Sequence, residues 1–251
     1  MSGRLPSIYA DPELYDLVHA EGTDDEAWFL DRLAHDHGCG IKTLLEPACG
    51  TGRYLAAMLR RGWTVEGYDA AGGMLDFARK RLAGWGKRAR ISRGEMSAYR
   101  PKTKFGLIIN LLSTFRHLMT EKEALAHLKL MAGAMEPGGI FVLGLDLSNY
   151  EDDFPDEEVW ECRQGGRRAK HVVMSIPPER DTRRERIINF VTAKGKILES
   201  SYDLRSYSAS ELEELLARSP LRIEAVYGYD GKPQVWGGPE RALWLVLKLR
   251  S

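Results

Sequence analysis

The sequence lacks an excess of charge of either sign. Lysine and arginine together number 36, aspartate and glutamate together number 36, and the formal net charge at pH 7 is zero. Proteins that attract nucleic acid or an anionic membrane over long range carry a clear basic excess. We therefore expect neither nucleic acid nor a membrane as a partner.

Cysteine is also scarce. The three residues Cys39, Cys49 and Cys162 are odd in number and do not have the spacing of metal ligands. This argues against a disulfide framework and a metal site, and it fits a reducing compartment. No apolar run reaches the length of a membrane span, and the segment Met1–Pro6 is not an apolar signal segment. We expect a cytoplasmic protein without a bound metal.

Short apolar segments alternate with helical segments through the first part of the chain. Expected strands cover residues 42–45, 64–68, 89–92, 105–111 and 140–147, with a turn at 136–139 before the last of them. Helices are expected between them, and capping boxes at Thr23, Thr120 and Ser208 mark three helix starts. Continuous apolar strands separated by helices predict a doubly wound α/β fold with a parallel sheet covered on both faces.

The pattern changes after residue 148. Extended segments are expected at residues 170–176, 184–192 and 196–204, with turns at Pro177-Pro178 and Lys194-Gly195. They predict an antiparallel insertion, followed by a helix and two closing strands at 221–227 and 242–249. We expect one domain in four parts: an N-terminal helical cap (1–40), a core (41–148), the insertion (149–206) and a closing unit (207–251).

The run from Glu46 to Gly52 carries the strongest functional signal. It places an acid at a strand end, a glycine-rich turn, and a helix that begins near Arg53. Glycine allows close approach of a ligand to the backbone, and the helix start presents free N–H groups. A carboxylate beside this loop suits an amine or hydroxyl better than a pyrophosphate. Leu55 also stands where the dinucleotide fingerprint requires a small residue.

Asp69 is the second anchor. It ends the next expected strand, 17 residues after Gly52. In a doubly wound sheet such an acid faces the same crevice as the loop and holds two ribose hydroxyls. Dehydrogenases share this feature, so a nicotinamide-dependent oxidoreductase stays open as an alternative at this point.

Five motifs in this order resemble those of the class I S-adenosylmethionine-dependent methyltransferases of small-molecule type. They are Glu46–Gly52, Asp69-Ala70-Ala71-Gly72-Gly73-Met74-Leu75, Gly94-Glu95-Met96, Asn110–Leu118 and Met135–Gly139. The sequence departs from the family pattern at Ala71, where serine is usual, and at Glu95, where aspartate is commoner.

The resemblance implies a seven-stranded, mostly parallel sheet in the order 3-2-1-4-5-7-6, with the last strand antiparallel and the insertion acting as a lid. It implies S-adenosylmethionine as cofactor and S-adenosylhomocysteine as product. In the family, the residue at Met74 packs near the adenine and the acid at Glu95 accepts from its amino group. The residues that would bind the cofactor are Glu46, Ala48, Gly50, Gly52, Arg53, Asp69, Ala70, Met74, Glu95, Met96, Asn110 and Leu111.

The implied reaction is in-line methyl transfer to a small molecule with a nitrogen or oxygen nucleophile, in which the site mainly aligns the partners. His117 is the candidate base, and Tyr9, Tyr15, Arg116 and Tyr202 are candidates for the substrate pocket. Structural roles for His117 and the tyrosines stay open.

Three questions about partners and activity remain at this stage. The insertion either covers the substrate or forms the contact of a homodimer. A non-catalytic protein that binds the cofactor as a sensor is the alternative function. A nucleic-acid methyltransferase is disfavoured, because Asn110 is followed by Leu111-Leu112-Ser113 and not by the motif used on flipped bases.

Overall fold

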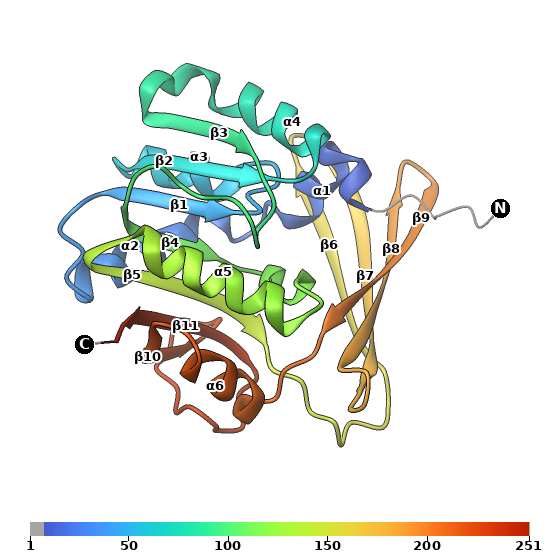
Figure 1. Ribbon diagram of the computed structural model, residues 1–251. Helices are drawn as coiled ribbons and strands as arrows, with labels where there is room; N and C mark the ends of the chain where they lie inside the picture. The colour runs from blue at the N-terminus through green and yellow to red at the C-terminus, as the bar shows by residue number, and fades with distance from the viewer. Residues whose placement is uncertain (1–7, 251) are drawn as a thin grey trace.

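The computed structural model describes residues 8–250, so the first seven residues of the predicted cap, and Ser251, lie outside it. Within that range the main sheet has seven strands, in the order β10-β11-β5-β4-β1-β2-β3 (Figure 1). The strands are β1 (Thr43–Pro47), β2 (Thr64–Asp69), β3 (Ala89–Arg93), β4 (Phe105–Asn110), β5 (Met135–Asp146), β10 (Leu221–Gly228) and β11 (Ala242–Leu249). β11 is antiparallel to both of its neighbours, and the predicted strand order is confirmed.

Helices cover both faces of this sheet. These helices are α2 (Thr23–Asp36), α3 (Arg53–Arg60), α4 (Gly72–Leu82), α5 (Glu121–Ala134) and α6 (Ala209–Ala217). A further helix, α1 (Pro12–His19), packs mainly on the insertion. Short 3-10 turns are η1 (Ile8–Ala10), η2 (Ala83–Arg88) and η3 (Thr114–His117). None of the described helices is long and apolar enough to cross a membrane.

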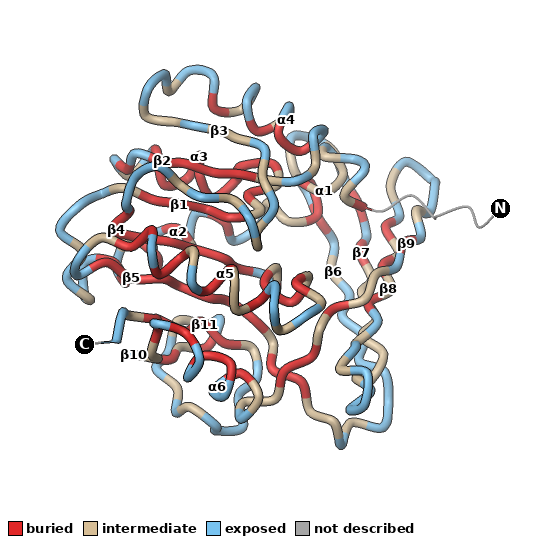
Figure 2. Tube along the Cα trace, viewed as in Figure 1, coloured by how far each residue is buried: buried red, intermediate tan, exposed pale blue. Residues whose placement is uncertain are grey.

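The core is split by the sheet into two layers. In β5, Phe141 and Leu143 pack with α5 and α6, whereas Ile140 and Val142 pack with α2 and α3. Because alternate side chains of a strand face opposite sides, both faces of such a strand must be apolar. Figure 2 shows the central strands as the most continuously buried part of the chain.

Two of the three predicted capping boxes are confirmed. Thr120 caps α5 and Ser208 caps α6, each with the reciprocal bond from the glutamate three residues later. The prediction at Thr23 is wrong, because Thr23 is already the first residue of α2 and Gly22 occupies the cap position with a φ of 76°. The Thr23 hydroxyl instead donates to the carbonyl of Ala20.

Two predicted turns lie inside strands. The 136–139 segment is a bulge of β5: Phe105 pairs with Met135 and Leu107 pairs with Ile140, so extra residues loop out between these pairs. Pro177 and Pro178 lie within a strand at the place where its ladder with the next strand is interrupted. Proline has no N–H to donate, so it is tolerated where no ladder bond is required.

The insertion is a separate antiparallel sheet of four strands within the described residues, in the order β6-β7-β8-β9. Its strands are β6 (Asp156–Gln164), β7 (Arg167–Glu179), β8 (Arg184–Ala193) and β9 (Lys196–Arg205). In Figure 1 the parallel strands of the main sheet point toward it, and η1 and α1 lie between the two sheets. One face of the insertion packs on α1 through a small apolar cluster that includes Leu17, Val18, Cys162 and Val191.

Candidate functional site

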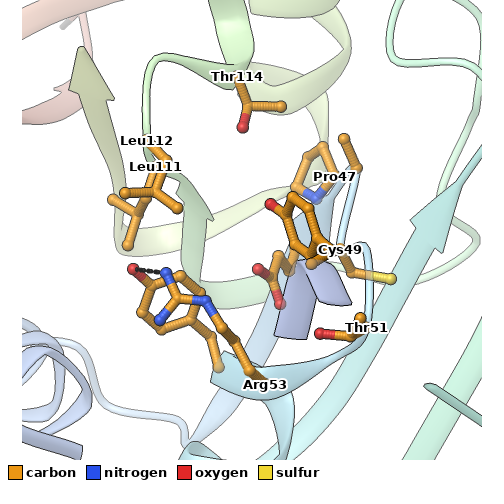
Figure 3. Close-up of a pocket in the computed structure, with 11 residues that line it drawn as sticks. Pro47, Cys49, Thr51, Arg53, Leu111, Leu112 and Thr114 are labelled. Carbon is orange, nitrogen blue, oxygen red and sulfur yellow. Dashed lines mark hydrogen bonds between the residues drawn. The ribbon is translucent and has the colours of Figure 1, made fainter. Parts of the chain in front are cut away.

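A pocket lies at the carboxyl ends of β1 and β4, next to α1. The side chains around it come from three segments distant in sequence (Figure 3). They are Tyr15, Glu46, Pro47, Ala48, Cys49, Thr51, Arg53, Tyr54, Leu111, Leu112 and Thr114. The carboxyl ends of parallel strands at a topological switch point are the usual place for a ligand in such folds.

The loop after β1 has a backbone geometry that favours glycine. Ala48, Gly50 and Gly52 all have positive φ values, of 51°, 52° and 70°. A Cβ on Gly52 would lie 3.2 Å from the Cβ of Ala78, so α4 packs directly against the loop. Glycine is required there for both the conformation and the close approach.

Asp69 holds this loop in place. One of its carboxylate oxygens accepts from the N–H of Gly50 at 2.8 Å, and the other accepts from the N–H of Ala71 at 2.8 Å. A carboxylate has about four lone-pair sites, so two remain for hydroxyl donors of a ligand. Sequence reasoning placed Asp69 at the site but did not foresee that it also fixes the loop.

Glu46 is a buried carboxylate that lacks a full set of partners. It is 7% exposed, and its Oε2 has no hydrogen-bond partner among the described residues. Burial raises the pKa of Glu46 well above its usual value, Asp69 raises it further, and Arg53 acts in the opposite direction. Burying such a group is costly unless a cation or donor meets it.

Arg53 supplies the opposite charge at the same pocket. Its guanidinium donates to the Thr23 hydroxyl at 2.5 Å and to the Tyr54 hydroxyl at 2.6 Å, the latter drawn as a dashed line in Figure 3. It also pairs with Glu26 at 3.3 Å. A buried carboxylate and a fixed guanidinium at one pocket complement the amine and the carboxylate of an amino-acid group.

The motifs expected near adenine continue along the same edge of the sheet. Met74 is buried on α4, Glu95 is exposed, and the carbonyl of Met96 accepts from the Nδ1 of His127 at 3.0 Å. Asn110 donates to the carbonyl of Pro47 at 3.2 Å, and its Oδ1 has no partner among the described residues. His127 was not predicted, because the sequence shows it only as a histidine on an apolar helix face.

Two of the candidate substrate residues, Tyr9 and Tyr202, contact the candidate base, and a third, Tyr15, packs against Tyr9. The Tyr9 hydroxyl lies 3.2 Å from the Nε2 of His117. The Tyr202 ring lies 5.6 Å from the Tyr9 ring and 5.2 Å from the His117 ring, and Tyr15 stands 5.5 Å from Tyr9. Burial, with Arg116 next to it, lowers the pKa of His117 to about 4, so its imidazole is neutral at pH 7. We call Tyr9, Tyr15, His117 and Tyr202 the aromatic cluster.

Arg116 has a different role from the one predicted. It is 2% exposed, donates to the carbonyl of Arg205 at 2.9 Å and to that of Asp146 at 3.2 Å, and forms an ion pair with Glu185. All of its guanidinium nitrogens are thus bonded to protein groups. We assign it to joining η3 with β5 and the insertion, so it does not supply a free charge to a substrate.

A buried ion pair that the sequence did not reveal anchors α1 over the loop. Asp16 is 2% exposed, pairs with Arg81 of α4 at 2.5 Å and accepts from the Thr51 hydroxyl at 2.9 Å. Burial alone would raise the pKa of Asp16, but the Arg81 contacts hold it below the ordinary value. In sequence, Asp16 was only one of several acids in this segment.

Comparisons with known proteins find methyltransferases that resemble this chain. A family described as "Methyltransferase domain" matches residues 44–139. The chain is 27% identical over 225 residues to a dTDP-3-amino-3,4,6-trideoxy-alpha-D-glucopyranose N,N-dimethyltransferase of Streptomyces venezuelae, covering 86% of this chain and 92% of the relative. It is 34% identical over 134 residues to a dTDP-3-amino-3,6-dideoxy-alpha-D-glucopyranose N,N-dimethyltransferase of Streptomyces fradiae, covering 52% and 51%.

Solved structures share the whole architecture. The amino pentose methyltransferase CalS10 of Micromonospora echinaspora, solved with bound S-adenosylmethionine, is 23% identical and superposes with a TM-score of 0.72 over 98% of this chain and 99% of that one. Streptomyces venezuelae DesVI is 24% identical, with a TM-score of 0.74 over 93% and 95%. The common fold therefore includes the insertion as well as the main sheet.

Proposed function

The chain is a class I S-adenosylmethionine-dependent methyltransferase that acts on a small molecule, and we propose that this molecule is an amino sugar methylated on its amine. The observation that carries the amino sugar is the likeness, over 86% of the chain, to an amino sugar N,N-dimethyltransferase. The second relative, also an amino sugar N,N-dimethyltransferase, supports the same acceptor class.

The residues of the pocket fit the cofactor. We assign the unpartnered Oε2 of Glu46 to accept from its amine, and Arg53 to hold its carboxylate. Asp69 keeps two lone-pair sites for the ribose hydroxyls, and the positive-φ loop lets the backbone approach closely. When bound, S-adenosylmethionine supplies an electrophilic methyl group on a sulfonium.

The aromatic cluster is where we place the acceptor amine. An amine attacks only as the neutral base, with its lone pair free. A neutral His117 can accept a hydrogen bond from that amine, and the Tyr9 hydroxyl, whose pKa burial raises, stays protonated as its neighbour. With a pKa of about 4, His117 is a weak proton acceptor, so we assign it to orienting the amine, while loss of the proton to solvent precedes attack.

The experiment uses purified protein, S-adenosylmethionine and three acceptors: the two dTDP-linked amino sugars named above, and glycine. Glycine is included because a mouse glycine N-methyltransferase is 30% identical over 169 residues. We expect S-adenosylhomocysteine and a methylated amine, detected by mass spectrometry, with at least one of the sugars and not with glycine. Turnover of glycine in preference to both sugars would refute the amino sugar proposal.

We also propose that the protein is cytoplasmic, that it forms a homodimer and that it does not bind nucleic acid. The three cysteines are free, which suits a reducing compartment. Val159 and Ile197, 48% and 70% exposed on the insertion, favour a contact with a second copy there. Light scattering coupled to gel filtration would report a mass of one chain if the dimer is wrong.

A further inference from the structure

The inner face of the insertion, the one that packs on α1, carries three polar side chains side by side. Asn189 of β8 stands directly opposite Ser200 of β9 and Val173 of β7, and His171 lies two residues before Val173 on the same face. The Nε2 of His171 lies 2.9 Å from the Oδ1 of Asn189. We call His171, Asn189 and Ser200 the polar trio.

The polar trio is buried and incompletely bonded. His171 is 1% exposed, Asn189 is 3% exposed and Ser200 is 1% exposed. The Nδ1 of His171, the Nδ2 of Asn189 and the hydroxyl of Ser200 have no hydrogen-bond partner among the described residues. Most buried polar atoms in proteins are bonded, because an unbonded one carries its full desolvation penalty. Three such atoms in one place indicate that something other than the described residues completes them.

The free atoms have a defined chemistry. The Asn189 oxygen can only accept, so the Nε2 of His171 carries the hydrogen and its Nδ1 is left as an acceptor. Burial lowers the pKa of His171, which keeps this ring neutral. The Ser200 hydroxyl both donates and accepts. A hydroxyl group, which also does both, satisfies such atoms, whereas an anion or a cation finds no opposite charge there.

The polar trio adjoins the aromatic cluster. The Tyr202 hydroxyl lies within reach of Asn189, and the Tyr202 ring is 5.2 Å from the ring of His117. On the other side, the Trp160 ring lies 4.5 Å from the ring of His171. Aromatic rings next to hydroxyl-binding groups suit a carbohydrate, which presents both C–H and O–H groups.

We propose that the polar trio binds ring hydroxyls of the acceptor sugar while the aromatic cluster receives its amine. This inference rests on the proposed function and adds the residues that would select a hydroxylated acceptor. The His19 ring of α1 lies 6.0 Å from the ring of His171, so α1 must shift for the acceptor to enter. The insertion is then the specificity element, and the parallel sheet serves the cofactor.

The test compares Ser200→Ala with Ser201→Ala. These neighbours lie on one strand, but Ser200 is buried on the inner face and Ser201 is exposed on the outer face. With the better of the two dTDP-linked amino sugars as acceptor, Ser200→Ala should raise the acceptor KM roughly five- to tenfold. This is the loss of binding expected when one hydrogen bond to the acceptor is removed. The dissociation constant for S-adenosylhomocysteine should not change, and Ser201→Ala should match the unmodified protein throughout.

Thermal unfolding distinguishes a role of Ser200 in acceptor binding from a role in the stability of the fold. Removing an unbonded buried hydroxyl should leave the melting temperature of Ser200→Ala unchanged or raised. An unchanged acceptor KM in Ser200→Ala would overturn the inference and leave the proposed function standing. A loss of activity accompanied by a lower melting temperature would do the same. If the unmodified protein methylates neither sugar, the proposed acceptor is wrong and the inference falls with it.

Discussion

Replacement of Glu46 by glutamine removes the buried acid that we assign to the cofactor amine. The side chain keeps its shape, and one carboxylate oxygen becomes an amide nitrogen that can only donate. The unmodified Oε2 has no partner among the described residues, so the variant loses no bond within the protein that the structure shows. Any loss of affinity therefore reports on the ligand.

The size of the effect follows from the charges involved. A hydrogen bond between charged groups contributes about 1.5–3 kcal/mol, so S-adenosylhomocysteine should bind Glu46→Gln roughly 10- to 150-fold more weakly. The free protein should instead gain stability, because a 7% exposed acid with a raised pKa is replaced by a neutral group. A gain of about 1 kcal/mol would raise the melting temperature by about 2–4 °C.

Calorimetric titration of two ligands isolates the contact. S-adenosylhomocysteine carries the amino-acid group, and 5′-methylthioadenosine lacks it, so only the first should lose affinity in the variant. Equal losses for both ligands, or none for either, would refute our reading of Glu46.

Three further changes test other parts of the structure. Asp16→Asn should lower the free energy of unfolding by about 1–3 kcal/mol in urea titrations, because it leaves Arg81 without its buried counter-charge; an unchanged midpoint would contradict this. Gly67→Ala would bring a Cβ to 2.5 Å from a leucine side chain and should cost about 1–3 kcal/mol, whereas Gly84→Ala, with open space around it, should not. Burial lowers the pKa of His127 to about 4, so the unfolded chain binds a proton at this residue more readily than the folded protein. The contribution of His127 to the free energy of unfolding should be fully present above pH 6.5 and should fall by about 3 kcal/mol on acidification to pH 4. The fall should be smaller in His127→Phe.

The pattern of neighbouring residues was sufficient to predict the parallel core and the turn after β1. The strand around Phe105–Asn110 is buried at every position, so its composition alone distinguishes it from a surface strand. The glycine-rich turn expected at Glu46–Gly52 is present, with positive φ at Gly50 and Gly52. These features depend on residues that are neighbours in sequence.

The errors and omissions depend on contacts between distant segments. The role of Arg116 follows from the carbonyl of Arg205 and the acid of Glu185, neither of which its own neighbours reveal. Similarly, the polar trio appears only once the register of β7, β8 and β9 is known, since a shift of one residue would place Ser201 inward and Ser200 outward. Sequence patterns do not fix such registers.

Methyl transfer from S-adenosylmethionine to a sugar amine is tested most directly with an isotopically labelled methyl group. The label is followed during incubation of S-adenosylmethionine with the protein and the dTDP-linked amino sugars. We predict one S-adenosylhomocysteine for each labelled methyl found on the sugar nitrogen. Tight binding of S-adenosylmethionine, with no label transferred to either sugar or to any metabolite of a cell extract, would contradict the account and favour a cofactor-binding sensor.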